Sequence, residues 1–154
     1  MKNEKIILGI DPGLATTGFG AICGRKILDF GVIETAKEQT LPERLCQLAS
    51  DFSQIMAQIK PQLVVVEKLI FVKNVTNGLQ VAHARGVILQ AIAAAQVECR
   101  EILPKDVKLH VCGFGNASKL QVQTMVKNIF SMAQIPRPDD AADALAIAFS
   151  ASGT

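Results

Sequence analysis

The sequence predicts an α/β domain in which a mixed sheet is flanked by helices. Three observations predict this class: short apolar runs of strand length gather near the N-terminus, another such run follows a long helical segment, and most of the C-terminal half has helical periodicity. The chain has 154 residues, which fits one domain spanning residues 1–154.

The first three strands are predicted from residue type and turn signals. Residues 5–10 form an apolar, β-branched run that stops at Asp11-Pro12-Gly13, a strong turn signal. Residues 18–23 and 26–35 flank Gly24-Arg25, which predicts a tight hairpin. The first strand therefore delivers Asp11 at its end.

A helix and two further strands are predicted next. Residues 41–59 carry apolar side chains at helical spacing, with a proline at the entry and another beyond the end. Residues 63–66 read Leu-Val-Val-Val and are followed by Glu67, so a second buried strand also ends in a carboxylate. Residues 97–102 are a candidate fifth strand.

The remaining elements are predicted to be helices. Residues 77–96 are apolar nearly all round toward their end, which is typical of a helix buried on two sides, one of them a candidate contact with another subunit. Residues 105–111 and 119–132 predict two more helices, and Pro136-Arg137-Pro138 is a stiff connector before a last helix that starts at Asp139.

Composition excludes several classes of protein. With 49% hydrophobic and 19% charged residues, the chain lacks the signature of a disordered protein. The apolar runs are too short for a membrane span or a signal peptide, so we expect a cytoplasmic location. The four cysteines show no C-x-x-C pair and are predicted to be buried, reduced thiols.

The net charge of +2 hides an uneven distribution. Residues 60–137 hold ten basic and four acidic residues, whereas both flanking segments are net negative. A nucleic-acid enzyme needs this division if lysines and arginines hold phosphates while carboxylates hold a metal. On charge alone, a solvated basic face explains the pattern as well.

Four acids stand out by context: Asp11 and Glu67 follow buried strands, while Asp140 and Asp143 share one face of the last helix. Strand ends meet at one edge of a sheet in this class, so the four carboxylates can converge. Their repulsion would be relieved by divalent cations, and oxygen ligands favour Mg²⁺ or Mn²⁺. Taken singly, each acid also fits a turn, a strand end or a helix first turn.

Five segments carry a resemblance to a known family. They are residues 7–20 (ILGIDPGLATTGFG), 66–74 (VEKLIFVKN), 84–87 (ARGV), 115–126 (GNASKLQVQTMV) and 140–147 (DAADALAI). In order and spacing they resemble the RuvC family of bacterial Holliday junction resolvases over nearly the whole chain. The resemblance implies an RNase H-like fold with a mixed five-stranded sheet and a homodimer. It also implies an endonuclease that resolves four-way DNA junctions by paired symmetric nicks in recombination and repair.

The resemblance also implies roles for single residues. The acidic site, for Mg²⁺ with Mn²⁺ able to substitute, maps onto Asp11, Glu67, Asp140 and Asp143. Asp139 does not align and is expected to cap its helix. The basic DNA-contacting positions match Lys108 and Lys119, and Lys73, Asn74 and Arg85 are neighbouring candidates. A branch-migration motor of RuvA and RuvB is the expected partner complex.

One departure from the family pattern concerns the residue that stacks on or wedges a junction base. The family usually places a phenylalanine three residues after the strand-end glutamate, whereas this chain has Ile70 there and Phe71 next. Either Phe71 takes over or an aliphatic wedge replaces the aromatic one. A core role for Phe71 is the third interpretation.

Two other functions compete. The actin-like ATPase and sugar-kinase clan also begins with a Gly-Ile-Asp-x-Gly strand turn, but those proteins need two such domains, which 154 residues cannot supply. The alternative is a catalytically inactive, RNase H-like DNA-binding adaptor. The presence of all four acids argues against the adaptor.

Overall fold

The computed structural model describes residues 4–70 and 74–153. A five-stranded sheet in the order β3-β2-β1-β4-β5 forms its centre. The strands are β1 (Ile6–Asp11), β2 (Thr16–Cys23), β3 (Lys26–Glu34), β4 (Leu63–Glu67) and β5 (Glu98–Ile102). The helices are α1 (Leu41–Ile59), α2 (Val75–Ala94), α3 (Pro104–Cys112), α4 (Lys119–Ile129) and α5 (Asp139–Ser150).

The sheet is mixed, as predicted. β1, β2 and β3 form an antiparallel meander, whereas β4 runs parallel to β1 and β5 runs parallel to β4. Because β1, β4 and β5 point the same way, their C-terminal ends lie at one edge of the sheet. Asp11 and Glu67, the last residues of β1 and β4, lie at this edge.

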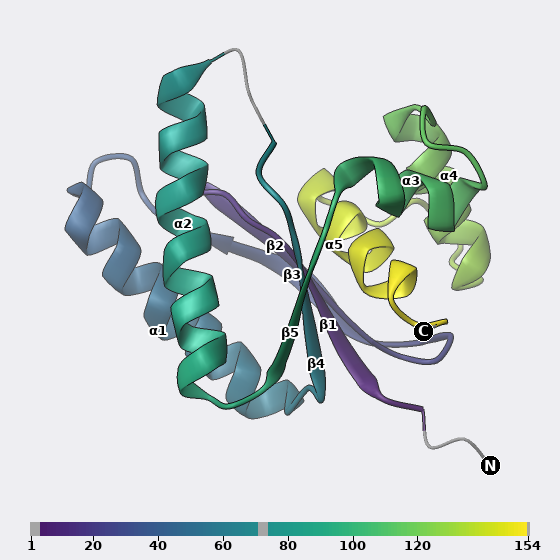
Figure 1. Ribbon diagram of the computed structural model, residues 1–154, viewed down its shortest axis with the longest axis horizontal. Helices are drawn as coiled ribbons and strands as arrows, with labels where there is room; N and C mark the ends of the chain where they lie inside the picture. Colours follow the sequence, from purple (N-terminus) through teal and green to yellow (C-terminus); the bar gives the residue numbers. More distant parts are fainter. Residues whose placement is uncertain (1–3, 71–73, 154) are drawn as a thin grey trace.

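Helices cover both faces of the sheet (Figure 1): α1 and α2 lie on one face, and α3, α4 and α5 lie on the other. Alternation along the buried strands sends their side chains to both layers. In β1, Leu8 and Ile10 join the cluster under α1 and α2, while Ile7 joins the cluster under α3, α4 and α5. A strand buried on both faces is the reason that β1 and β4 are continuous apolar runs.

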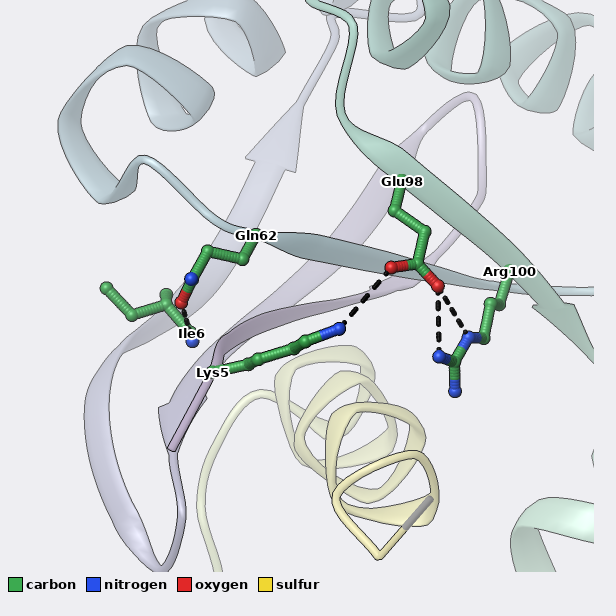
Figure 2. Close-up of polar contacts among 5 residues, drawn as sticks. All are labelled: Lys5, Ile6, Gln62, Glu98 and Arg100. Atoms are coloured by element: carbon green, nitrogen blue, oxygen red, sulfur yellow. Dashed lines mark hydrogen bonds and ion pairs between the residues drawn. The ribbon is translucent and has the colours of Figure 1, made fainter. Parts of the chain in front are cut away.

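Polar contacts stabilise the other end of the sheet, where β1, β4 and β5 begin (Figure 2). The Glu98 carboxylate pairs with Lys5 at 3.5 Å and with Arg100 at 2.9 Å. The backbone N–H of Ile6 donates to Gln62 Oε1 at 3.0 Å, and the Gln62 N–H donates to the Ile6 carbonyl at 2.9 Å. These contacts fix the starts of β1, β4 and β5, far from the acid-bearing ends.

The bounds of α2, α3 and α4 differ from the sequence prediction by one to three residues, and those of α3 by one residue at each end. α2 begins two residues early because Asn74 caps it, accepting a hydrogen bond from the Asn77 N–H at 3.2 Å. The helix predicted to run to Met132 ends at Ile129, because Ser131 adopts the left-handed conformation (φ 51°) and the Met132 N–H turns back to Lys127.

The burial predicted for the cysteines is wrong within the described chain. The cysteines are free thiols, as expected, but Cys46 and Cys99 are exposed and the other two are only partly buried. Cys46 lies on α1 and Cys99 on β5, a strand with a neighbour on one side only. Within the single chain α2 is buried on one side, and Val75 and Leu79 are exposed on the other, so the subunit contact predicted for that second side stays a prediction.

Among the described residues, no helix combines the length and the apolar character that crossing a membrane requires.

Candidate active site

Asp11 and Glu67 are neighbours because their strands are parallel and adjacent. The β1–β4 pairing runs in register to Ile10 opposite Val66, so the next residue of each strand is an acid. Both carboxylates are only partly exposed. The sheet alone therefore brings together two of the four acids predicted from the sequence.

α5 supplies the other two acids, and glycines let it approach. In β2, Gly18 pairs with Asp11, and a Cβ at Gly18 would overlap the Asp140 backbone. A Cβ at Gly9 in β1 would likewise overlap the backbone of α5 at Ala144. The helix axis can therefore lie close against the two strands, which places its first turns beside Asp11. A glycine inside a strand often marks such an approach, so Gly9 and Gly18 are a signal for it in the sequence.

Three carboxylates meet closely enough to share a cation. One oxygen each from Asp11, Asp140 and Asp143 lies within 4.8 Å of the others. Oxygens bound to one Mg²⁺ at about 2.1 Å would be about 3 to 4 Å apart, so small side-chain movements suffice. Glu67 is not in this group of three, but its charge acts on Asp11, and Asp143 acts on Glu67.

Burial and repulsion make these acids hard to ionise. Burial, followed by the charges of Glu67, Asp143 and Asp140, raises the pKa of Asp11 to about 8. Burial and the Asp143 charge raise the pKa of Glu67 to about 7 against the opposing effect of Lys108. The pKa of Asp143 is also raised, mainly by burial. The carboxylates repel one another when they are ionised, so the site suits a divalent cation, which would compensate their negative charge.

Two lysines border the acids. A cavity of about 250 Å³ opens between α3, α4 and α5, and both lysines line it together with acids from β4 and α5. Its lining is Glu67, Pro104, Val107, Lys108, Lys119, Val122, Asp143 and Ala146. Lys119 Nζ lies 3.5 Å from Asp143 and 3.7 Å from Asp139. Burial opposes the charge of Lys119, but Asp143 and Asp139 raise its pKa, so it remains a cation at the cavity.

The predicted capping role of Asp139 is wrong. The N-cap position of α5 is Pro138, which offers no side-chain cap, and Asp139 is the first helical residue. Its carboxylate instead pairs with Arg137 at 2.6 Å and with Lys119. An acid in the first turn still favours the helix through its dipole.

The remaining predicted DNA contacts follow β4 in the sequence, and Arg85 lies within α2. Ile70 is 52% exposed, and Asn74 caps α2. Arg85 is turned inward, and its side chain is only 15% exposed. Phe71 and Lys73 lie outside the described residues. Contact of any of these residues with DNA stays a prediction.

The turn after Asp11 is held by side chains that the sequence analysis did not single out. Thr17 Oγ1 donates to the Gly13 carbonyl at 2.6 Å, and Thr35 Oγ1 donates to the Leu14 carbonyl at 2.5 Å. Arg44 on α1 donates its Nε–H to Thr35 Oγ1 at 2.9 Å. The contact of Thr35 with Leu14 joins residues 21 apart in sequence, so only the fold reveals it.

Comparison with known proteins identifies the family. The family model described as "Crossover junction endodeoxyribonuclease RuvC" matches residues 7–151. This chain belongs to the RuvC family. The RuvC of Syntrophomonas wolfei is 45% identical over 92% of this chain and 85% of its own length. The RuvC of Thermotoga petrophila is 43% identical over 93% of this chain and 89% of its own length.

Solved structures agree with this assignment. RuvC of T. thermophilus in complex with Holliday junction substrate has a TM-score of 0.89 and 30% identity, covering 95% of this chain and 92% of that chain. The yeast mitochondrial Holliday junction resolvase Ydc2 has a TM-score of 0.70, but at 15% identity it shows only a shared fold. The RuvC resemblance and the RNase H-like fold predicted from the sequence are therefore confirmed.

Proposed function

We propose that this RuvC-family chain resolves four-way DNA junctions by hydrolysing one phosphodiester bond in each of two strands, in recombination and repair. The observation that carries the proposal is that Asp11, Asp140 and Asp143 converge within 4.8 Å, with Glu67 at the end of the neighbouring strand and two lysines beside them. A non-catalytic DNA-binding adaptor would have no need to keep mutually repelling carboxylates half-buried, since that arrangement opposes ionisation.

We further propose Mg²⁺ as the metal, with Asp11, Asp140 and Asp143 as ligands and Glu67 completing the site from the next strand. When bound, such an ion polarises the scissile phosphate and the attacking water. An all-oxygen donor set suits Mg²⁺ or Mn²⁺ better than zinc. The chain's own contribution is to hold the oxygens in place through β1, β4 and the close approach of α5.

Lys108 and Lys119 have the role of phosphate contacts in this proposal. Both line the cavity beside the acids, so a backbone phosphate entering it would meet two cations next to the metal ligands. Contacts of this kind position the DNA and supply salt-dependent affinity without reading its sequence. Exposed Ile70, with Phe71 next in the chain, is the candidate base wedge.

A homodimer follows from the symmetry of the reaction. Two matched cuts require two active sites at a fixed separation, which a two-fold dimer provides. The outer face of α2, defined by Val75, Leu79, Ala82, Gly86 and Ala93, is exposed along its length and offers apolar and small side chains for this contact. Partnership with a RuvA–RuvB motor and a cytoplasmic location stay predictions.

The test is nicking of a labelled four-way junction with Mg²⁺, beside a linear duplex. We expect paired nicks on the junction and little cutting of the duplex. Asp11→Asn should reduce nicking at least about 100-fold because it removes a charged metal ligand, while junction binding without metal stays near wild type. Asp51→Asn, on α1 across the sheet, is the matched control and should nick normally.

Two results would contradict the proposal. Normal nicking by Asp11→Asn would remove Asp11 from the metal site. A wild-type protein that binds junctions tightly but leaves every strand intact, with Mg²⁺ and with Mn²⁺, would favour the adaptor.

A further inference from the structure

Arg85, a residue of α2, contacts the C-terminal end of β4 and the neighbouring strand β5. Its Nε–H donates a hydrogen bond to the backbone carbonyl of Glu67 at 3.1 Å. Its Nη2 lies 3.5 Å from Glu101 Oε2 on β5. A single guanidinium therefore joins α2, the last residue of β4 and the edge strand.

The backbone of Glu67 is fixed from two sides. On the β5 side Glu67 pairs with Ile102, and the next N–H, of Lys68, donates to the Ile102 carbonyl at 2.7 Å. The pairing of β4 with β1 stops one residue earlier, at Val66. The hydrogen bond from Arg85 thus restrains the Glu67 backbone from α2. At this residue β4 no longer pairs with β1.

The same contacts leave little of Arg85 for DNA. Its side chain is only 15% exposed, and Nη2 is buried without a hydrogen bond in the described part of the chain, apart from the longer ion pair to Glu101. A phosphate contact would need this buried cation to leave Glu101 and the Glu67 carbonyl. The burial and the direction of the hydrogen bond both oppose that movement.

We propose that Arg85 is a positioning residue that fixes Glu67 in the active site, rather than a contact to DNA phosphate. This inference rests on the proposed nuclease function. Arg85 touches the backbone of Glu67 and not its carboxylate, so it acts through the placement of the strand end. Outer partners of metal ligands typically change metal affinity or activity about 10- to 100-fold when they are removed.

The guanidinium shape makes the proposal testable by a conservative change. A lysine keeps the positive charge, and it would serve a phosphate contact well as a point charge. A single ammonium cannot reproduce the fork that reaches both the Glu67 carbonyl and the Glu101 carboxylate. Arg85→Lys therefore separates the two roles: it should preserve a DNA contact but fail to preserve positioning.

The experiment compares the full-length wild type with Arg85→Lys, Arg85→Ala, Glu101→Gln and Lys119→Ala. Junction binding is measured without metal over a salt series, and single-turnover nicking is measured at saturating protein over a Mg²⁺ series. Thermal melting without DNA, with and without Mn²⁺, reports metal binding independently of activity.

Positioning predicts that both Arg85 variants bind the junction within about twofold of wild type, with an unchanged salt slope. Their nicking rate should fall about 10- to 100-fold, their half-saturating Mg²⁺ concentration should rise, and Mn²⁺ should raise their melting temperature less. Glu101→Gln should change the same quantities in the same direction by less. Lys119→Ala should instead weaken junction binding and reduce the slope of log affinity against log salt concentration by about 1, the effect of losing one phosphate contact.

The proposal is overturned if Arg85→Lys nicks like wild type, or if Arg85→Ala behaves like Lys119→Ala in the binding series. Should the Arg85 variants melt too low to assay, Glu101→Gln decides, and a wild-type Mg²⁺ dependence in that variant counts against positioning.

If the wild type does not nick at all, the nuclease proposal has failed. Positioning is then judged by the Mn²⁺ melting shift alone, and equal shifts in wild type and Arg85→Lys reject it.

Discussion

Asp11 is held in surroundings that favour its neutral form. Its ordinary pKa of 3.8 is raised to about 8 by burial and by Glu67, Asp143 and Asp140. A raised pKa means that the folded protein binds this proton more tightly than the unfolded chain does. The resulting stability is fully present below about pH 4 and is lost as the pH rises through about 8. Glu67, raised to about 7, acts with the same sign.

Asp11→Asn should therefore stabilise the metal-free protein at alkaline pH. The amide cannot ionise, so at pH 8 to 9 we expect a gain of about 2 kcal/mol in the free energy of unfolding, equivalent to about 4 to 8 °C in melting temperature. The gain should shrink toward pH 4, where the wild-type carboxyl is protonated. Urea unfolding in the presence of a chelator, at several pH values, measures it.

Mg²⁺ provides the control for this pH effect. It should stabilise the wild type at pH 8 more than the variant, because binding to the folded state alone adds stability. A variant that is less stable than the metal-free wild type at pH 8 would show that the acids do not oppose folding.

At the scale of elements, the placement of α5 depends on glycines in β1 and β2 as well as on the side chains that it packs into the core. The Cβ of Gly18→Ala would overlap the Asp140 backbone, and backbone cannot move aside as the end of a flexible side chain does. We expect a loss of about 1 to 3 kcal/mol in stability from this overpacking. A displacement of α5 by about 1 Å should also cost about 100-fold in nicking.

Gly31→Ala is the matched control for this prediction. It also adds a Cβ to a strand, but at Gly31 the nearest atoms belong to the Phe19 ring at 3.2 Å, away from the acids. Urea unfolding and junction nicking, measured on both variants, separate stability from site geometry. Nicking by Gly18→Ala at the wild-type rate would show that α5 tolerates the displacement.

The sequence predicted correctly the helices and strands that arise from the residue pattern of their own segment. Apolar runs ending in Asp11 and Glu67 gave the parallel strands, and their shared direction placed the two acids correctly at one sheet edge. The end of α4 was missed because the left-handed conformation falls on Ser131, a residue without the usual glycine signal. The inward direction of Arg85 depends on β4 and β5, so the ARGV motif alone could not reveal it.

At the scale of the whole molecule, the outer face of α2 lies on the side away from the helix's own core contacts. Gly78, Ala84, Ile88 and Ile92 pack inward, whereas Leu79 is 57% exposed. Arg85 precedes exposed Gly86, so the helix that fixes Glu67 inward also presents the proposed dimer face outward. In the proposed dimer, this arrangement would let the two-fold axis set the distance between the two active sites.

Leu79→Glu should therefore separate the protomers without unfolding them. An exposed side chain contributes little to the monomer core, but a buried carboxylate at a two-fold contact would face its own copy, so we expect the dimer dissociation constant to rise at least about tenfold. Sedimentation measures the association.

A cruciform plasmid measures the outcome of cutting, since paired cuts give linear DNA and single cuts give nicked circles. The variant should shift products toward nicked circles, whereas Leu28→Glu on β3, 41% exposed, should stay dimeric and give linear DNA. A Leu79→Glu protein that remains dimeric and still linearises the plasmid would place the interface elsewhere.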